Sequence, residues 1–255
     1  MLITALSHFD QDITRSRQLL EHADTLPVGV LQRDIRRSAW MMSVGALDAY
    51  FCDAYADTIA RVLRAREIQT EIEIPERLQN LRVPVIAIIR SNVNESWRWR
   101  IAARELIESD TVLSLEKIKS LFNQFFRGDH KLFGATSFDS WLVHPTSRHG
   151  LFGVSKNTYR KLTGSAKNTQ RKKVKEKFEE RFQLIFQRRH DCIHNCDRPK
   201  ISITKSMVNK SDPVEKVIID IEFLVHRFNA DLTTEFPIYL RLLGFNGVTR
   251  NRVGA

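Results

Sequence analysis

A short stretch near position 190 gathers side chains that can carry out acid–base and phosphate chemistry. Within eight residues it contains Arg188, Arg189, His190, Asp191, His194 and Asn195. An imidazole gives and takes protons near neutral pH, and a guanidinium offers a fork of donors that matches phosphate oxygens. RNA cleavage without a metal needs a base for the 2′-hydroxyl, an acid for the leaving 5′-oxygen and a cation on the phosphate. The stretch therefore has the residue types for metal-free phosphodiester cleavage.

The residues before this stretch predict a long amphipathic helix that ends in it. On a helical wheel the apolar side chains fall within an arc of about 120°, and they are Val174, Phe178, Phe182, Ile185, Phe186 and Ile193. Arg189 falls near the centre of the same arc, and burying an unpaired guanidinium costs several kcal/mol. We therefore expect Arg189 either to pair with an acid on a neighbouring helix or to face a cleft that binds an anion.

The end of this helix decides whether Arg189 and His194 can meet. Five residues of unbroken helix turn by about 140°, so the two side chains would diverge. Pro199 cannot continue a helix for long, and Asn195 and Asp197 favour a turn. We therefore expect the helix to fray between residues 191 and 195, so that His194 can turn back toward Arg189.

The spacing Arg189-x4-His194, with His190 directly after the arginine, resembles the R-x4–6-H motif of the HEPN superfamily (higher eukaryote and prokaryote nucleotide-binding domains). The string Arg-His-Asp-Cys-Ile-His is most similar to versions in the RiboL-PSP-like and related bacterial branches. The segment 38–51, with Asp48 among small and aromatic residues, resembles the second helix of that family. The resemblance implies a helical, usually dimeric domain. Many members are metal-independent ribonucleases whose active site forms between two protomers, and others only bind.

The resemblance also implies roles for individual residues. Arg189 and His194 would be catalytic, and the supporting residues would be Asp48, His190, Asp191 and Asn195. In a two-fold dimer, one protomer's His194 would act as base and the other's as acid, leaving a 2′,3′-cyclic phosphate. We expect a homodimer that acts on RNA without a cofactor or metal, in bacterial defence or a toxin–antitoxin system with an antitoxin or other partner protein.

Three other interpretations of the same residues stay open. The protein could be a non-catalytic RNA-binding or regulatory module. The basic residues could merely complement a helix C-terminus, with Arg189 and Asp48 forming a structural ion pair. A third interpretation is a metal site, because four potential ligands alternate, namely His190, Cys192, His194 and Cys196. Four ligands at two-residue spacing crowd a tetrahedral ion, so we do not expect a metal.

Positive charge is concentrated just before the motif. The formal net charge is +10, and residues 140–175 hold nine lysines and arginines and no acid. Such a run is often only a solvated surface, but this one adjoins the candidate site, which favours contact with a phosphate backbone. The residues expected to bind RNA are Arg171, Lys172, Lys173 and Arg188.

The rest of the chain predicts an all-α protein with one domain over residues 1–255. The predicted HEPN-like antiparallel helical bundle has its core in residues 7–66 and 170–240 and a large helical and loop insertion over 67–169. The first helix, over 7–23, is polar and should lie on the surface. Residues 127–169 hold five of the ten glycines between Gly128 and Gly164, which predicts long loops.

Composition limits the class of protein and its compartment. Three cysteines, an odd and sparse set, argue against a disulfide framework and for a reducing compartment. The N-terminal residues lack the pattern of a signal peptide, and the longest apolar run is too short to span a bilayer. The sequence has no GxxxxGK[ST] or GxGxxG motif, which disfavours nucleotide hydrolysis. We expect a cytoplasmic protein with no membrane partner.

Overall fold

The computed structural model describes residues 2–79, 99–100, 103–104, 107, 114–195 and 210–254. Every regular element in these ranges is helical, which confirms the predicted all-α class. The long helices are α1 (Leu2–Thr25), α2 (Val30–Ile68), α10 (Gly164–Asn195) and α11 (Ser211–Leu242). The shorter helices are α3 (Glu76–Gln79), α6 (Leu115–Phe122), α7 (Ala135–Val143), α8 (His149–Phe152), α9 (Lys156–Arg160) and α12 (Gly247–Arg252), and Asn123–Phe125 and Gly128–His130 form 3₁₀ turns.

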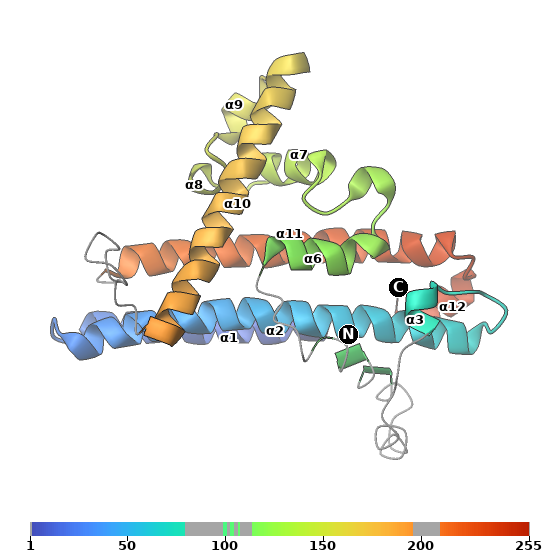
Figure 1. The fold of residues 1–255 in the computed structure, drawn as a ribbon, viewed down its shortest axis with the longest axis horizontal. Coiled ribbons are helices and arrows are strands. Elements are labelled where there is room, and N and C mark those ends of the chain that lie inside the picture. The colour runs from blue at the N-terminus through green and yellow to red at the C-terminus, as the bar shows by residue number, and fades with distance from the viewer. Residues whose placement is uncertain are drawn as a thin grey trace, which may run out of the picture.

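Three long helices form a bundle in which each packs against the other two, with α1 antiparallel to α2 and α11 parallel to α2 (Figure 1). The first helix was predicted to be a polar surface helix, and most of α1 is indeed exposed or partly exposed, but one face of it belongs to the core. The buried residues on that face are Ala5, Phe9, Ile13, Ser16, Leu20 and Ala23. Polar side chains of α1 also link it to α2 and α11. Ser16 donates to the carbonyl of Ala39 at 3.2 Å, and the Arg17 guanidinium bonds Glu222 on α11.

Aromatic rings fill the core between α2, α11 and α6. Phe51 of α2 and Phe228 of α11 pack edge to face at 4.8 Å, and Phe122 of α6 joins Phe228 at 4.6 Å. Phe125 is also fully buried next to Phe122. Residues of the stretch predicted as an insertion thus share a core with α2 and α11. The boundary of that insertion stays a prediction.

A second aromatic cluster lies where α7 and α8 pack against the first half of α10. Phe178 of α10 contacts Phe138 and Trp141 of α7 and stacks on Phe152 of α8. The prediction of long loops over 127–169 is therefore wrong. Apolar side chains in this region bury themselves on α10, and four of its five glycines, all but Gly150, lie at helix ends. Gly153, with φ of 68°, ends α8, and such a left-handed residue commonly terminates a helix.

Helix α10 crosses the three-helix bundle at a steep angle, and its C-terminal end lies over the beginning of α2 (Figure 1). The indole N–H of Trp40 donates to the carbonyl of Ile185 at 3.4 Å, which ties α2 to α10 at the crossing. One turn earlier on α10, Arg181 donates to the buried carboxylate of Asp220 on α11 at 2.8 Å. These contacts hold the last turns of α10 in place and so position the candidate site.

Candidate functional site

The candidate residues lie on the last two turns of α10, which continues as a helix through Asn195. The expected fraying between residues 191 and 195 is therefore wrong. Two contacts explain the continuation: Gln187 donates to Asp191 one turn later at 2.9 Å, and Cys192 is buried on the side of the helix that faces the core. Asp197 and Pro199, which were expected to end the helix, lie outside the described residues.

Because the helix is unbroken, Arg189 and His194 of one chain point about 140° apart. His194 has a different neighbour in its own chain. The rings of His190 and His194, one turn apart, have their centroids 4.4 Å from each other. A single protomer therefore presents a pair of imidazoles on one side of α10 and a guanidinium on another, and it does not bring together the two residues expected to be catalytic.

Arg189 is half-buried and forms no hydrogen bond or ion pair with any residue that the structure describes. The structural pair with Asp48 is not formed, since no bond within the described ranges joins these two side chains. Asp48 lies instead beside Cys52 on α2. Burial, together with the charges of Asp48 and Asp53, raises the pKa of the Cys52 thiol to about 12.

Asp191 and Arg188 are more enclosed than residues of a surface motif would be. Asp191 is 6% exposed and accepts the bond from Gln187, and Arg188 is half-buried. Asn195 is the last residue of α10. Ile193 was expected on the buried stripe, but it is 47% exposed. The wheel correctly places Val174, Phe178, Phe182 and Ile185 in the core, and it fails at Ile193 because the buried face of α10 has by then turned toward Asp191 and Cys192.

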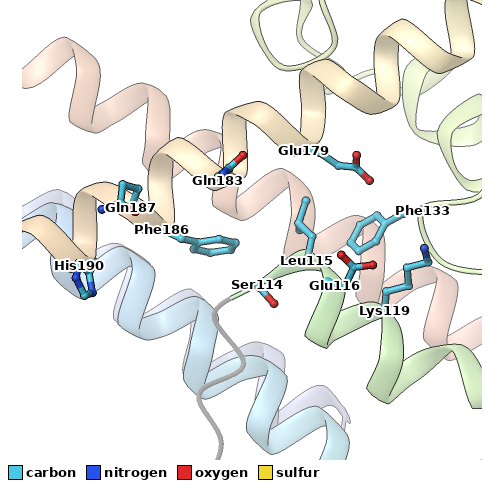
Figure 2. Close-up of a pocket in the computed structure, with 10 residues that line it drawn as sticks. All are labelled: Ser114, Leu115, Glu116, Lys119, Phe133, Glu179, Gln183, Phe186, Gln187 and His190. Carbon is cyan, nitrogen blue, oxygen red and sulfur yellow. The ribbon is translucent and has the colours of Figure 1, made fainter. Parts of the chain in front are cut away.

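A pocket of about 610 Å³ opens between α10 and α6 next to this motif, as Figure 2 shows. From α10 it is lined by Glu179, Gln183, Phe186, Gln187 and His190. The opposite wall consists of Ser114, Leu115, Glu116 and Lys119 at the start of α6, with Phe133 beside them. Since His190 lines the pocket and also touches His194, the pocket and the motif are continuous.

Sequence reasoning missed this pocket, although one signal was present. Glu179, Gln183 and Gln187 recur at four-residue intervals, which places a carboxylate and two amides on one face of α10 next to Phe186. On a helix such a stripe normally indicates a solvated surface. The other wall comes from α6, some sixty positions earlier, and no local pattern reports that α6 faces this stripe.

The residues expected to bind RNA differ in their surroundings. The guanidinium of Arg171 is held by the carboxylate of Asp139, to which its Nε donates at 2.7 Å, and Lys167 lies 3.1 Å from the same carboxylate. Burial opposes ionisation of Asp139, but hydrogen bonds from Arg171, Tyr159 and Lys167 outweigh it and lower the pKa of Asp139 to about 2. Lys172 and Lys173 are exposed and pair with no acid among the described residues, so their ammonium groups are open to an anion.

The structure also bears on the metal interpretation and on membranes. Within the described ranges, no group of three or more histidines, cysteines and acids is placed so as to hold a metal ion. Cys192 is buried, and Cys196 lies outside those ranges. No helix in the described part of the chain combines the length and the apolar character needed to cross a bilayer.

Comparison of the chain with models of known families, with curated proteins and with solved structures finds no match in any of the three. The resemblance to the HEPN superfamily therefore stays a prediction that depends on the motif at 189–194 and the helix around Asp48.

Proposed function

We propose that this protein is a metal-independent endoribonuclease of HEPN type, with a composite site made by two copies of the chain. The observation that carries the proposal is the end of α10. There a half-buried Arg189, without an acid partner among the described residues, lies within a turn of the paired imidazoles of His190 and His194. An arginine left without an acid partner is suited to receive a phosphate.

The direction of the side chains favours a dimer. Arg189 and His194 diverge on one helix, so a phosphate held by one chain's arginine needs a histidine from another chain. A two-fold axis through the end of α10 would supply it, because such an axis places the same surface of each protomer against the other. Ile193, exposed by 47% on the side of Arg189, is an apolar side chain that this contact would bury.

The proposed reaction needs only groups present in this dimer. One His194 takes the proton of the 2′-hydroxyl, and the 2′-oxygen forms a bond to phosphorus. The bond from phosphorus to the 5′-oxygen breaks, and the second His194 gives that oxygen a proton. Arg189 balances the charge on the phosphate throughout. The products are a 2′,3′-cyclic phosphate and a 5′-hydroxyl.

The exposed Lys172 and Lys173, with the net charge of +10, favour a second candidate function. They would attract RNA whether or not the motif is catalytic. In this alternative the chain is a non-catalytic RNA-binding or regulatory module. A setting in bacterial defence or with an antitoxin is part of the proposal through the family resemblance alone, as is a cytoplasmic location.

The test is incubation of the purified chain with a pool of structured RNA in EDTA, followed by analysis of the 3′ ends. We expect wild type to cleave and to leave cyclic phosphate ends, and we expect neither Arg189→Ala nor His194→Ala to cleave. Arg241→Ala on α11 and His149→Ala on α8, both at exposed positions outside the last two turns of α10, are matched controls that should keep full activity. If the two motif variants alter only RNA affinity, the binding module is correct. Cleavage that needs a divalent metal would overturn the mechanism.

A further inference from the structure

We infer that the pocket between α6 and α10 binds a guanine base, and that this base belongs to the RNA cleaved at the end of α10. The second half of this inference rests on the proposed function, and the first half does not.

The walls of the pocket suit a flat ring. Phe186 of α10 and Leu115 of α6 offer apolar surface, and Phe133 lies on the far side of Leu115 from Phe186 (Figure 2). The ring of Phe133 is held by Trp141 and Phe178, each 5.7 Å away, and its backbone has a left-handed φ of 58°. Proteins that read single-stranded RNA stack unpaired bases on aromatic side chains in this manner.

The polar groups select among the bases. The carboxylates of Glu179 and Glu116 point into the space between α10 and α6 from opposite sides (Figure 2). Glu116 forms no ion pair with a described residue, and Glu179 has only Lys175 at 3.8 Å on the surface of its own helix. A carboxylate only accepts hydrogen bonds, so the ligand must bring donors. Guanine presents two donors side by side, its ring N1–H and its 2-amino group, which match the two oxygens of one carboxylate.

The other edge of guanine also finds partners. Its O6 and N7 both accept hydrogen bonds, and a lysine is a common partner for them. Lys119 lines the pocket beside Glu116, and Gln183 offers an amide N–H from the opposite wall. Uracil has no exocyclic amine, and adenine and cytosine have no second adjacent donor. The combination of carboxylate and ammonium therefore favours guanine over the other three bases.

The arrangement along α10 has a direction. Glu179 and His190 are separated by roughly 16 Å of helix at 1.5 Å per residue. The two carboxylates would repel a phosphate, whereas His190 and the neighbouring Arg189 would attract one. A nucleotide in this groove therefore places its base near Glu179 and its phosphate near His190. That orientation brings the phosphate next to guanine to the proposed catalytic histidine, His194.

The experiment measures binding by calorimetry in EDTA, with the Arg189→Ala/His194→Ala protein so that no RNA is cut. The probes are the 5′-monophosphates of guanosine, inosine, adenosine, cytidine and uridine, and single-stranded hexanucleotides with one guanine or one hypoxanthine. Inosine lacks only the 2-amino group. We expect guanine to bind about tenfold more tightly than hypoxanthine and the other bases, as loss of one charged hydrogen bond predicts.

Variants locate the binding. Glu116→Gln and Glu179→Gln should each weaken guanine binding about tenfold, because the amide no longer offers two acceptors. Glu180→Gln is the matched control on the next residue of α10, where the carboxylate bonds Lys177 at the surface, and it should change nothing. Equal binding of all bases, binding of none, or binding that ignores the two pocket variants would overturn the inference.

The two kinds of probe separate the sources of guanine. A preference in the hexanucleotides supports RNA as the ligand. A preference in the monophosphates without one in the hexanucleotides supports a free guanine nucleotide and overturns the link to RNA cleavage. The Arg189→Ala/His194→Ala variant used for these measurements lacks both proposed catalytic groups. Guanine binding can therefore succeed even if the nuclease proposal fails, and the reverse also holds.

Discussion

The rings of His190 and His194 lie one turn apart at the end of α10, with their centroids 4.4 Å from each other. His190 also lines the pocket, so the two histidines have different surroundings. His194→Ala should reduce the rate of RNA cleavage by about 10²- to 10⁴-fold, the usual effect of losing a general acid or base. His190→Ala should act mainly on KM for guanine-containing RNA, because His190 lines the pocket in which we propose that the nucleotide binds. Steady-state kinetics on a fluorescent oligonucleotide separate the two effects, and equal losses in kcat for both variants would contradict these separate roles.

Arg189 should matter for activity and not for stability. Its guanidinium has no partner among the described residues, so Arg189→Lys should change the free energy of unfolding by less than about 0.5 kcal/mol. The same variant should lower kcat about tenfold or more, because an ammonium cannot make the two parallel bonds of a guanidinium to a phosphate. Urea unfolding and cleavage assays on one preparation measure both quantities. A large loss of stability would indicate a structural arginine.

Arg181 should behave in the opposite way. It donates to Asp220 at 2.8 Å, and the Asp220 side chain is 6% exposed, with Arg148 at 3.7 Å as its other cation. Arg181→Ala leaves a buried carboxylate half-compensated, and we expect a loss of about 2–4 kcal/mol in unfolding free energy. Lys177→Ala on the same helix removes only a surface pair with Glu180 and should cost less than about 0.5 kcal/mol. Urea titration of both variants tests the difference. Similar losses would show that the burial of Asp220 does not control stability.

Asp139 should make stability depend on pH in the acid range. Its pKa of about 2 in the folded protein lies below the ordinary value of 3.8. The carboxylate therefore stabilises the fold above about pH 4, and the contribution disappears as the pH falls from 4 to 2. After allowance for solvent screening, we expect about 1 kcal/mol. Unfolding by urea at several pH values should show this loss in wild type and not in Asp139→Asn. Glu176→Gln, at an exposed position, should retain it.

The composite site predicts interference between active and inactive chains. If both copies of His194 serve one site on a two-fold axis, a heterodimer of wild type and His194→Ala is inactive. Adding an equal amount of the variant to a fixed amount of wild type should then lower cleavage by about half, since random pairing divides wild-type chains equally between the two kinds of dimer. Ile193→Glu should give a folded but monomeric and inactive chain, measured by sedimentation. Cleavage unaffected by the added variant would mean that each protomer acts alone.

Helical periodicity predicted much of the fold. The buried stripe of Val174, Phe178, Phe182 and Ile185 follows from spacing alone, and the structure buries all four side chains. The glycines between 128 and 164 were misleading, because turn residues indicate where helices end and say nothing of the short helices between them. Trp141 and Phe152 show why: their burial depends on α10, which follows them in the chain.

The candidate site was predictable by residue type and less so by geometry. Arg189, His190 and His194 could be selected from the sequence, but the continuation of α10 past Asp191 depends on a bond from Gln187 that propensity does not reveal. The pocket could not be predicted, since Glu116 and Glu179 are brought together by the packing of α6 beside α10. Local patterns report which face of a helix is polar, and they do not report what that face meets.

Helix α10 packs against two parts of one continuous core. Its first half supplies Phe178 to the ring cluster of α7 and α8. Its second half is joined to α2 by the hydrogen bond from Trp40 to the carbonyl of Ile185. If α10 separated from either the α7–α8 cluster or α2, it would lose a large part of the buried surface that keeps it folded. The α7–α8 cluster and the three-helix bundle should therefore unfold together in a single cooperative transition, and a mutation that loosens the α7–α8 cluster should also destabilise the far end of α10, where the histidines are.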